Sequence, residues 1–385
     1  MEEILMDILS RLPVKSVIRF NCVSKFWKTL IFQPYFKKKH LNHAKNQLSS
    51  QNMIFVHWDH KSQLWCVISD NEDIPIFDYC NSNSKPIDGV KIFSSCDGLF
   101  LIGIWTDRGI EQPAGLVIWN PSTRQSIRLP HSKFSLQIGY DNDDDGDRGS
   151  TYGMAYDSTS DDYKIFRIDI SGEKDNEILA LKNGSWRIID GKISGGRTDS
   201  RLLRGREFLA FVDGAFHWIG FLSKVCVISF NISDEMYGEI SLPETISSQL
   251  TLSQFKKAEL EVDIHVGVSE LRGMLGVYHK DDNNYNLWAM KKYGIKDSWM
   301  KLFTIVIAGG SYYNIKPKYT FSDDRVLLCF DKVIWVTPNS TRTEYIYRII
   351  SSDPMFPQQD YDKGDVMDEE GDVYTDTLIF PKLGH

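Results

Sequence analysis

The segment "CDGLFLIG", residues 96–103, recurs in altered form as "VDGAFHWIG" at residues 212–220 and as "LRGMLGVYH" at residues 271–279. Each copy carries a glycine at the matching place, namely Gly98, Gly214 and Gly273. The first two glycines are 116 positions apart and the last two are 59 apart, which is close to two periods and one period. The chain therefore contains an internal repeat, which is the first feature that a repeat architecture shows in its sequence.

Each copy is followed by an apolar run, a polar turn and another apolar run, as in "LVIWNPSTRQSIRLP" and "CVISFNISDEMYGEISLP". A period of about 50–60 residues with roughly four short strands per unit is typical of a β-propeller blade. The same period places further copies at "YGMAYD", residues 152–157, and at "DDRVLLCF", residues 323–330. We count about five copies, and we expect the strands after Met53 and the final "DTLIFPKL", residues 376–383, to form a sixth together.

The first 45 residues follow a different pattern, in which apolar side chains recur at helical spacing. Pro13 ends a first predicted helix and starts a second one, because proline lacks a donor N–H and disfavours helix in the residue before it. Ser24 is a suitable N-cap for a third helix that contains Trp27. Three short helices cannot bury all their apolar side chains among themselves, so the surplus needs a partner or the rest of the chain.

The opening sequence "EEILMDILSRLPVKSVIRFNCVSKFWKTLI" resembles an F-box, the helical motif that docks on the Skp adaptor of cullin-RING ubiquitin ligases. The matching pieces are "ILSRLPVKS", "RFNCVSKFW" and Trp27 with a basic residue behind it. F-boxes of this kind usually have a Leu-Pro before the two acidic residues, and here Met1 stands directly before Glu2. The resemblance implies that the following residues bind the adaptor: Ile4, Leu5, Ile8, Leu9, Leu12, Pro13, Val17, Ile18 and Trp27.

The later segments "NPSTRQSIRLP", "YGMAYDSTSDDYKIFRI", "DGAFHWIG" and "YGIKDSWMKLFTI" resemble the F-box-associated, kelch-like domain of plant F-box proteins. Within that group the likeness is greatest to the S-locus F-box proteins of self-incompatibility. The resemblance implies a mainly β protein with a three-helix F-box at residues 1–45 and a propeller of about six blades at residues 50–385. It also implies a non-enzymatic substrate receptor of a Skp-cullin-F-box ligase, whose substrate is a protein such as a basic ribonuclease.

Charge is distributed unevenly along the chain. The formal net charge is −8, but residues 1–50 hold nine Lys/Arg and three Asp/Glu, which gives +6 and leaves −14 for the remainder. An acidic body argues against nucleic acid as the partner. No apolar run reaches the length of a membrane span, and a Met-Glu-Glu start is unlike a signal peptide, so we expect a cytoplasmic or nuclear protein without a membrane partner.

The acidic run "DNDDDGD" at residues 141–147 matches the first half of a calcium-binding loop. Its ninth and twelfth positions are Gly149 and Tyr152, so the closing carboxylate is absent, and we interpret the run as a solvated loop without metal. Charged loops can steer an oppositely charged partner, so Asp143, Asp144 and Asp145 are candidate substrate-binding residues.

No enzyme motif emerges from the sequence. His217 in "DGAFHWIG" is expected to be a core histidine, the six cysteines form no CxxC pair, and no pattern for a zinc site, a P-loop or a dinucleotide cofactor occurs. We therefore expect neither catalysis nor a cofactor. Two alternatives remain at this stage: a propeller enzyme whose active site has no sequence signature, and a degenerate F-box protein that acts outside a ligase.

Overall fold

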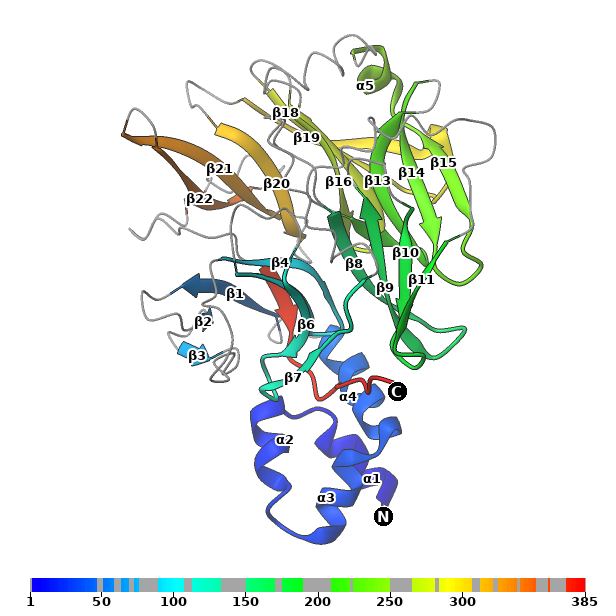
Figure 1. The fold of residues 1–385 in the computed structure, drawn as a ribbon, viewed down its shortest axis with the longest axis vertical. Coiled ribbons are helices and arrows are strands. Elements are labelled where there is room, and N and C mark those ends of the chain that lie inside the picture. Colours follow the sequence, from blue (N-terminus) through cyan, green and yellow to red (C-terminus); the bar gives the residue numbers. More distant parts are fainter. Residues whose placement is uncertain are drawn as a thin grey trace. The chain divides into compact units, whose positions relative to one another are not determined.

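The computed structural model describes most of the chain, and it places helices first and sheets afterwards. The described residues are 2–46, 51–58, 64–68, 73–75, 89–106, 113–132, 150–169, 175–189, 209–221, 224–249, 265–280, 284–306, 312–320, 325–337, 340–350, 359–360 and 372–384. They confirm the predicted order of a helical segment followed by repeated four-stranded sheets (Figure 1).

Four helices form the N-terminal segment, one more than the sequence indicated. They are α1 (Glu2–Leu9), α2 (Val14–Phe20), α3 (Lys25–Phe32) and α4 (Pro34–Lys45). The three expected helices are present. The fourth begins with proline in its first turn, where the missing N–H costs nothing, and it was missed because most of its side chains are polar. We call α1 to α4 the helical domain.

Six antiparallel four-stranded sheets follow, named A to F here. Sheet A contains β24 (Asp372–Thr375), β1 (Gln51–Trp58), β2 (Leu64–Ile68) and β3 (Asp73–Pro75) in that order. Sheet B contains β4 (Gly89–Cys96), β5 (Leu99–Trp105), β6 (Gly115–Asn120) and β7 (Gln125–Arg128). Sheet C contains β8 (Ser150–Asp157), β9 (Asp162–Asp169), β10 (Glu177–Ala180) and β11 (Ser185–Ile188).

The remaining three sheets repeat this plan. Sheet D contains β12 (Ala210–Val212), β13 (Ala215–Phe221), β14 (Val225–Asn231) and β15 (Tyr237–Ser241), and is followed by α5 (Glu244–Gln249). Sheet E contains β16 (His265–Leu271), β17 (Met274–Lys280), β18 (Asn284–Met290) and β19 (Trp299–Val306), with a 3-10 turn at Lys296–Ser298. Sheet F contains β20 (Tyr312–Thr320), β21 (Val326–Thr337), β22 (Ser340–Ile350) and β23 (Gln359–Asp360).

The repeated glycines mark the turn between the first two strands of sheets B, D and E. Gly98 follows Asp97, and both have positive φ, 75° and 53°. Gly214 and Gly273 occupy the same place after Asp213 and Arg272, which also have positive φ. Two consecutive residues of positive φ form the two-residue turn whose twist suits a hairpin. The "YGMAYD" copy differs, because it forms strand β8 and the turn of sheet C comes later, at residues 158–161.

Sheet A joins the two ends of the chain, as the sequence predicted, but with a different segment. β24, residues 372–375, pairs antiparallel with β1, with Thr375 opposite Gln51 and Asp372 opposite Ile54. The expected strand "DTLIFPKL" is not a strand: residues 376–384 follow β24 as irregular chain. Pro381 within it cannot donate to a strand ladder, which is consistent with this difference.

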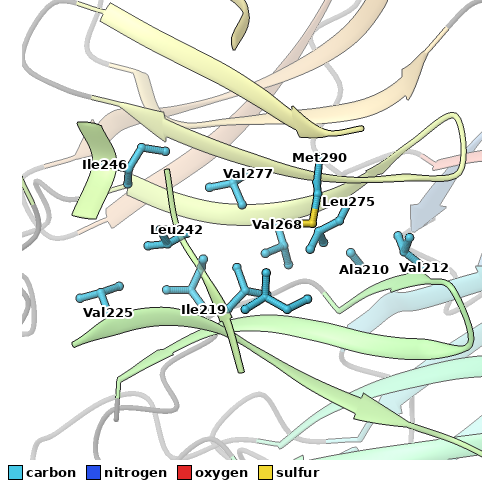
Figure 2. Packing of buried hydrophobic residues seen from close by; sticks show 12 residues of the cluster. Ala210, Val212, Ile219, Val225, Leu242, Ile246, Val268, Leu275, Val277 and Met290 are labelled. Carbon is cyan, nitrogen blue, oxygen red and sulfur yellow. The ribbon is translucent and has the colours of Figure 1, made fainter. Parts of the chain in front are cut away.

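By its contacts the chain divides into two compact units. One contains residues 1–138, 179–186 and 371–385, hence the helical domain and sheets A and B; the other contains residues 139–178 and 187–370. In the second unit each sheet packs on the next through a separate apolar cluster. Figure 2 shows the one between sheets D and E, where Ala210, Val212 and Ile219 face Val268, Leu275 and Val277.

Candidate docking surface of the helical domain

The helical domain has a filled core of its own. Its buried members come from all four helices and are Met6, Leu9, Val14, Val17, Leu30, Ile31 and Phe36, joined by Leu378 from the end of the chain. Local signals in the sequence position these helices. Ser24 accepts a hydrogen bond from the backbone N–H of Trp27 at 3.2 Å, which confirms it as the N-cap of α3.

Two of the residues proposed to bind the adaptor lie inside this core. Leu9 is 2% exposed and Val17 is fully buried, so neither offers surface to a partner. Their burial does not support that part of the prediction, which stays a prediction, since helical spacing shows which residues share a face but not which face turns inward. The four residues Leu5, Leu12, Ile18 and Trp27 are partly buried and pack on the edge of the core. Ile4, Ile8 and Pro13 are exposed.

The exposed apolar side chains extend beyond the predicted set. Four of them were not foreseen: Val23, Phe26, Phe32 and Tyr35. They lie before α3, within it, at its end and at the start of α4. The signal was available, since five of the eight residues of "KFWKTLIF" are apolar and only one face of α3 can pack on the core. Ile4 and Ile8 form a second exposed stripe, one turn apart on α1.

Basic side chains border these apolar residues. A shallow hollow is lined by Lys28, Thr29, Phe32 and Gln33. The Lys37 ammonium lies 5.3 Å from the centre of the Phe32 ring, which is within the range of a cation–π contact. Burial, together with repulsion from Lys382, lowers the pKa of Lys37. A partner that covers this surface needs apolar side chains and a surplus of acidic groups around them.

Asp7 anchors α1 on the basic side of the domain. Its carboxylate accepts from Arg11 one turn later at 2.7 Å and from Lys39 of α4 at 3.0 Å. The hydrogen bond from Lys39 and the nearby charges lower the pKa of the Asp7 carboxyl. This exposed cluster orients α1 against α4 and thereby fixes the direction in which Ile4 and Ile8 project.

His40 contacts the chain between α1 and α2. It is buried on α4, and its Nε2 lies 2.9 Å from the carbonyl oxygen of Leu12. Burial lowers the pKa of His40, so the neutral form is favoured in the folded domain.

The sheets contain buried charges, and several of them form ion pairs with one another. Arg167 is fully buried on β9, with nitrogen atoms 3.5 Å from carboxylate oxygens of Asp169 and Glu177. Tyr152 lies beside Arg167, and burial raises its pKa to about 12. This cluster is explained by structure without a catalytic role, because removing the buried arginine or its carboxylates would leave an uncompensated buried charge.

His217 is a core residue, as the sequence predicted. It is fully buried on β13, and its Nε2 lies 2.7 Å from the hydroxyl oxygen of Tyr293. Burial lowers the pKa of His217 to about 4. Within the part of the chain that the structure describes, no cluster of three or more His, Cys, Asp or Glu side chains could hold a metal ion.

Asp143, Asp144 and Asp145 lie outside the described residues, so their role stays a prediction. No helix among the described ranges is long and apolar enough to cross a bilayer.

These features describe a small helical domain with an exposed apolar surface, followed by repeated four-stranded β-sheets. Comparison with protein families gives two matches: the F-box domain over residues 2–39 and the F-box associated beta propeller domain over residues 67–379. The chain belongs to the F-box proteins that carry an F-box associated β-propeller. The mainly β prediction with an N-terminal F-box followed by a propeller is thereby confirmed, and the number of blades stays a prediction.

Similar proteins occur in Arabidopsis thaliana. The chain is 29% identical to F-box protein CPR1 over 326 residues, covering 79% of this chain and 72% of that protein. It is 26% identical to putative F-box protein At3g17490 over 355 residues, covering 86% and 82%. It is 25% identical to F-box/kelch-repeat protein At3g23880 over 317 residues, covering 79% and 78%.

Proposed function

We propose that this protein is the substrate receptor of a Skp-cullin-F-box ubiquitin ligase. The helical domain docks on a Skp-family adaptor, and the propeller holds a protein substrate near the ubiquitin-charged conjugating enzyme. The protein contributes proximity rather than chemistry, because tethering raises the effective concentration of substrate lysines. It acts in the cytoplasm, without a cofactor.

One observation carries the proposal: the helical domain exposes six large apolar side chains although its core is already filled. Phe26 is 51% exposed and Phe36 is fully buried, so the domain does not lack interior positions for aromatic side chains. Exposed apolar surface on a small domain marks an interaction site. The basic border fits an acidic adaptor, since complementary charge favours the correct partner and speeds association.

The test is binding of a purified plant Skp-family adaptor to the full chain by calorimetry. Phe26→Ala and Phe32→Ala each remove apolar contact area worth about 1.5–3 kcal/mol, so each should weaken binding by roughly 10- to 150-fold. Met236→Ala is the matched control, because Met236 is as exposed as these residues but lies between β14 and β15. Undiminished binding by the Phe26→Ala, Phe32→Ala double variant would exclude this surface.

The substrate class follows from charge and from the likeness to S-locus F-box proteins. Residues 51–385 carry a formal −14, which favours a basic protein, and a basic ribonuclease of self-incompatibility is the first candidate. We expect a basic ribonuclease to bind the full chain at low salt and to lose affinity as salt rises. An acidic ribonuclease of similar size is the control, and equal binding of the two would refute selection by charge.

A further inference from the structure

Residues 376–384, named the C-terminal strap here, connect the last strand of the chain to its first domain. The strap leaves β24 in sheet A and ends near the turn between β10 and β11, where the backbone N–H of Gly384 donates to the Leu181 carbonyl at 2.7 Å. In Figure 1 the C-terminus lies beside α4, within the same compact unit.

Sheet B holds the strap through one side chain at the end of β6. The Asn120 amide nitrogen donates to two strap carbonyls, at 3.1 Å to Thr377 and 2.7 Å to Ile379. Its amide oxygen meanwhile accepts from the backbone N–H of Thr123, which fixes its orientation. Asn120 is fully buried, so both contacts are shielded from water.

A second set of bonds fixes the start of the strap. The Asp376 carboxylate accepts from Ser122 at 2.7 Å and from Asn52 of β1 at 3.0 Å. Gly98 packs closely against the end of β24, and a Cβ atom at this position would overlap the Thr375 carbonyl oxygen. The strap is therefore seated only when sheets A and B are both formed.

The other side of the strap completes the helical domain. Leu378 is 5% exposed and belongs to the same buried cluster as Leu9, Val17 and Phe36. An ion pair also joins the helical domain to sheet B directly, since Lys45 at the end of α4 contacts Asp97 in the β4–β5 turn. The core of the first domain thus contains Leu378, a residue that is synthesised after every described strand of the sheets.

We propose that the C-terminal strap makes the docking surface of the helical domain conditional on a completed propeller. A helical domain of this size supports only a small core, so the loss of one buried leucine loosens the helices that present Ile8 and Phe26. Only a chain whose last strand has paired with its first can then engage the ligase. The effect of the strap on engagement of the ligase rests on the proposed function. The coupling between the strap and the stability of the helical domain does not.

The experiment uses Asn120→Ala, which removes two hydrogen bonds to the strap without changing any residue of the helical domain. The matched control is Asn231→Ala: Asn231 ends β14 as Asn120 ends β6, and its side chain accepts from the backbone N–H of Ser233 and Asp234, but it holds no strap. Hydrogen exchange of the α1–α3 amides and adaptor affinity are both measured. Leu378→Ala and a chain ending at Thr375 serve as further variants.

We expect Asn120→Ala, Leu378→Ala and the truncated chain to speed exchange in α1–α3 at least tenfold and to weaken adaptor binding at least tenfold. Asn231→Ala should change neither. A synthetic peptide of residues 376–385 should restore both properties to the truncated chain, which keeps its own β24. Parental exchange in α1–α3 of the Asn120→Ala and Leu378→Ala variants would overturn the coupling. Failure of the intact protein to bind the adaptor would instead refute the proposed function, and the exchange measurement would still decide the coupling.

Discussion

The helical domain and the sheets differ in how many large apolar side chains they expose to solvent. Nine such side chains are exposed among the described residues, and six of them belong to the 45 residues of the helical domain. The sheets expose only Met236, Tyr293 and Ile295 in the ranges that the structure describes. Since both regions have well-filled cores, the difference shows that the apolar surface of the helices is not explained by a lack of interior positions, which is why we propose it as a docking surface.

The largest expected effect separates two phenylalanines of the helical domain. Phe36→Ala should lower the free energy of unfolding by about 3–5 kcal/mol, because it empties a fully buried site. Phe26→Ala should change the free energy of unfolding by less than about 0.5 kcal/mol, because this side chain is exposed to solvent in the folded protein. Urea denaturation followed by circular dichroism measures both. Equal losses would show that Phe26 packs in the interior and would remove the contrast between the two regions.

Low pH should destabilise the sheets through the buried side chain of His217. In the unfolded chain His217 takes up a proton as the pH falls below about 6.5, whereas the folded protein resists protonation until about pH 4. The stability due to neutral His217 is therefore present above pH 6.5 and is lost as the pH falls towards 4, by up to about 3 kcal/mol. Burial of His40 acts in the same direction in the helical domain.

The measurement is the unfolding free energy between pH 7 and pH 4. His217→Gln should flatten the decline, because glutamine does not titrate. His131→Gln is the control, since His131 is exposed after β7. A decline of unchanged slope in the His217→Gln variant would assign the acid sensitivity to other groups.

The outcome at individual residues shows what sequence can and cannot predict here. Gly98, Gly214 and Gly273 were sufficient to find the repeat, because a two-residue turn demands particular residues wherever it occurs. Ser24 was found for the same reason, as a cap depends on its own neighbours. Leu9 was expected on the exposed side of α1 and is buried, and Phe26 was not singled out although it is exposed on α3, because the choice of the buried face depends on tertiary packing.

Contacts between distant parts of the chain were harder to predict. The helix α4 was missed although Phe36, His40, Leu41 and Ala44 follow helical spacing, because its remaining residues are mostly polar. The seating of Leu378 among residues of α1 to α4 has no local signal at all. It depends on the pairing of β24 with β1, which only the completed fold brings about.

A smaller effect concerns the start of α3. Ser24→Ala should cost about 1 kcal/mol, because the backbone N–H of Trp27 loses its acceptor and Phe26 and Phe32 are held less firmly. Thr29→Ala is the matched control, since its hydroxyl bonds only the Lys25 carbonyl one turn back on an exposed face. Thermal denaturation compares the two. A loss for Thr29→Ala as large as that for Ser24→Ala would indicate a general weakness of α3 and no capping effect.

The smallest expected effect on stability comes from the acidic run. Changing Asp143, Asp144 and Asp145 to Asn should leave the unfolding free energy within about 0.5 kcal/mol of the parent. It should slow association with a basic protein partner and reduce the salt dependence of that rate, because distant charges act on the approach. Stopped-flow kinetics at low and moderate salt tests this. A parental association rate at low salt would exclude steering, and a change in the dissociation rate alone would indicate direct contact.

The two-residue turns have an evolutionary consequence. The Asp97–Gly98 turn joins β4 to β5 with only two residues, so an inserted residue there must be absorbed by a longer loop, as at residues 158–161 of sheet C, or by a shift of register. Other connections are longer, such as residues 291–298 between β18 and β19, and an insertion there costs little loop-closure entropy. Paralogues should therefore vary in length at the longer connections and hold a constant length at the two-residue turns of sheets B, D and E.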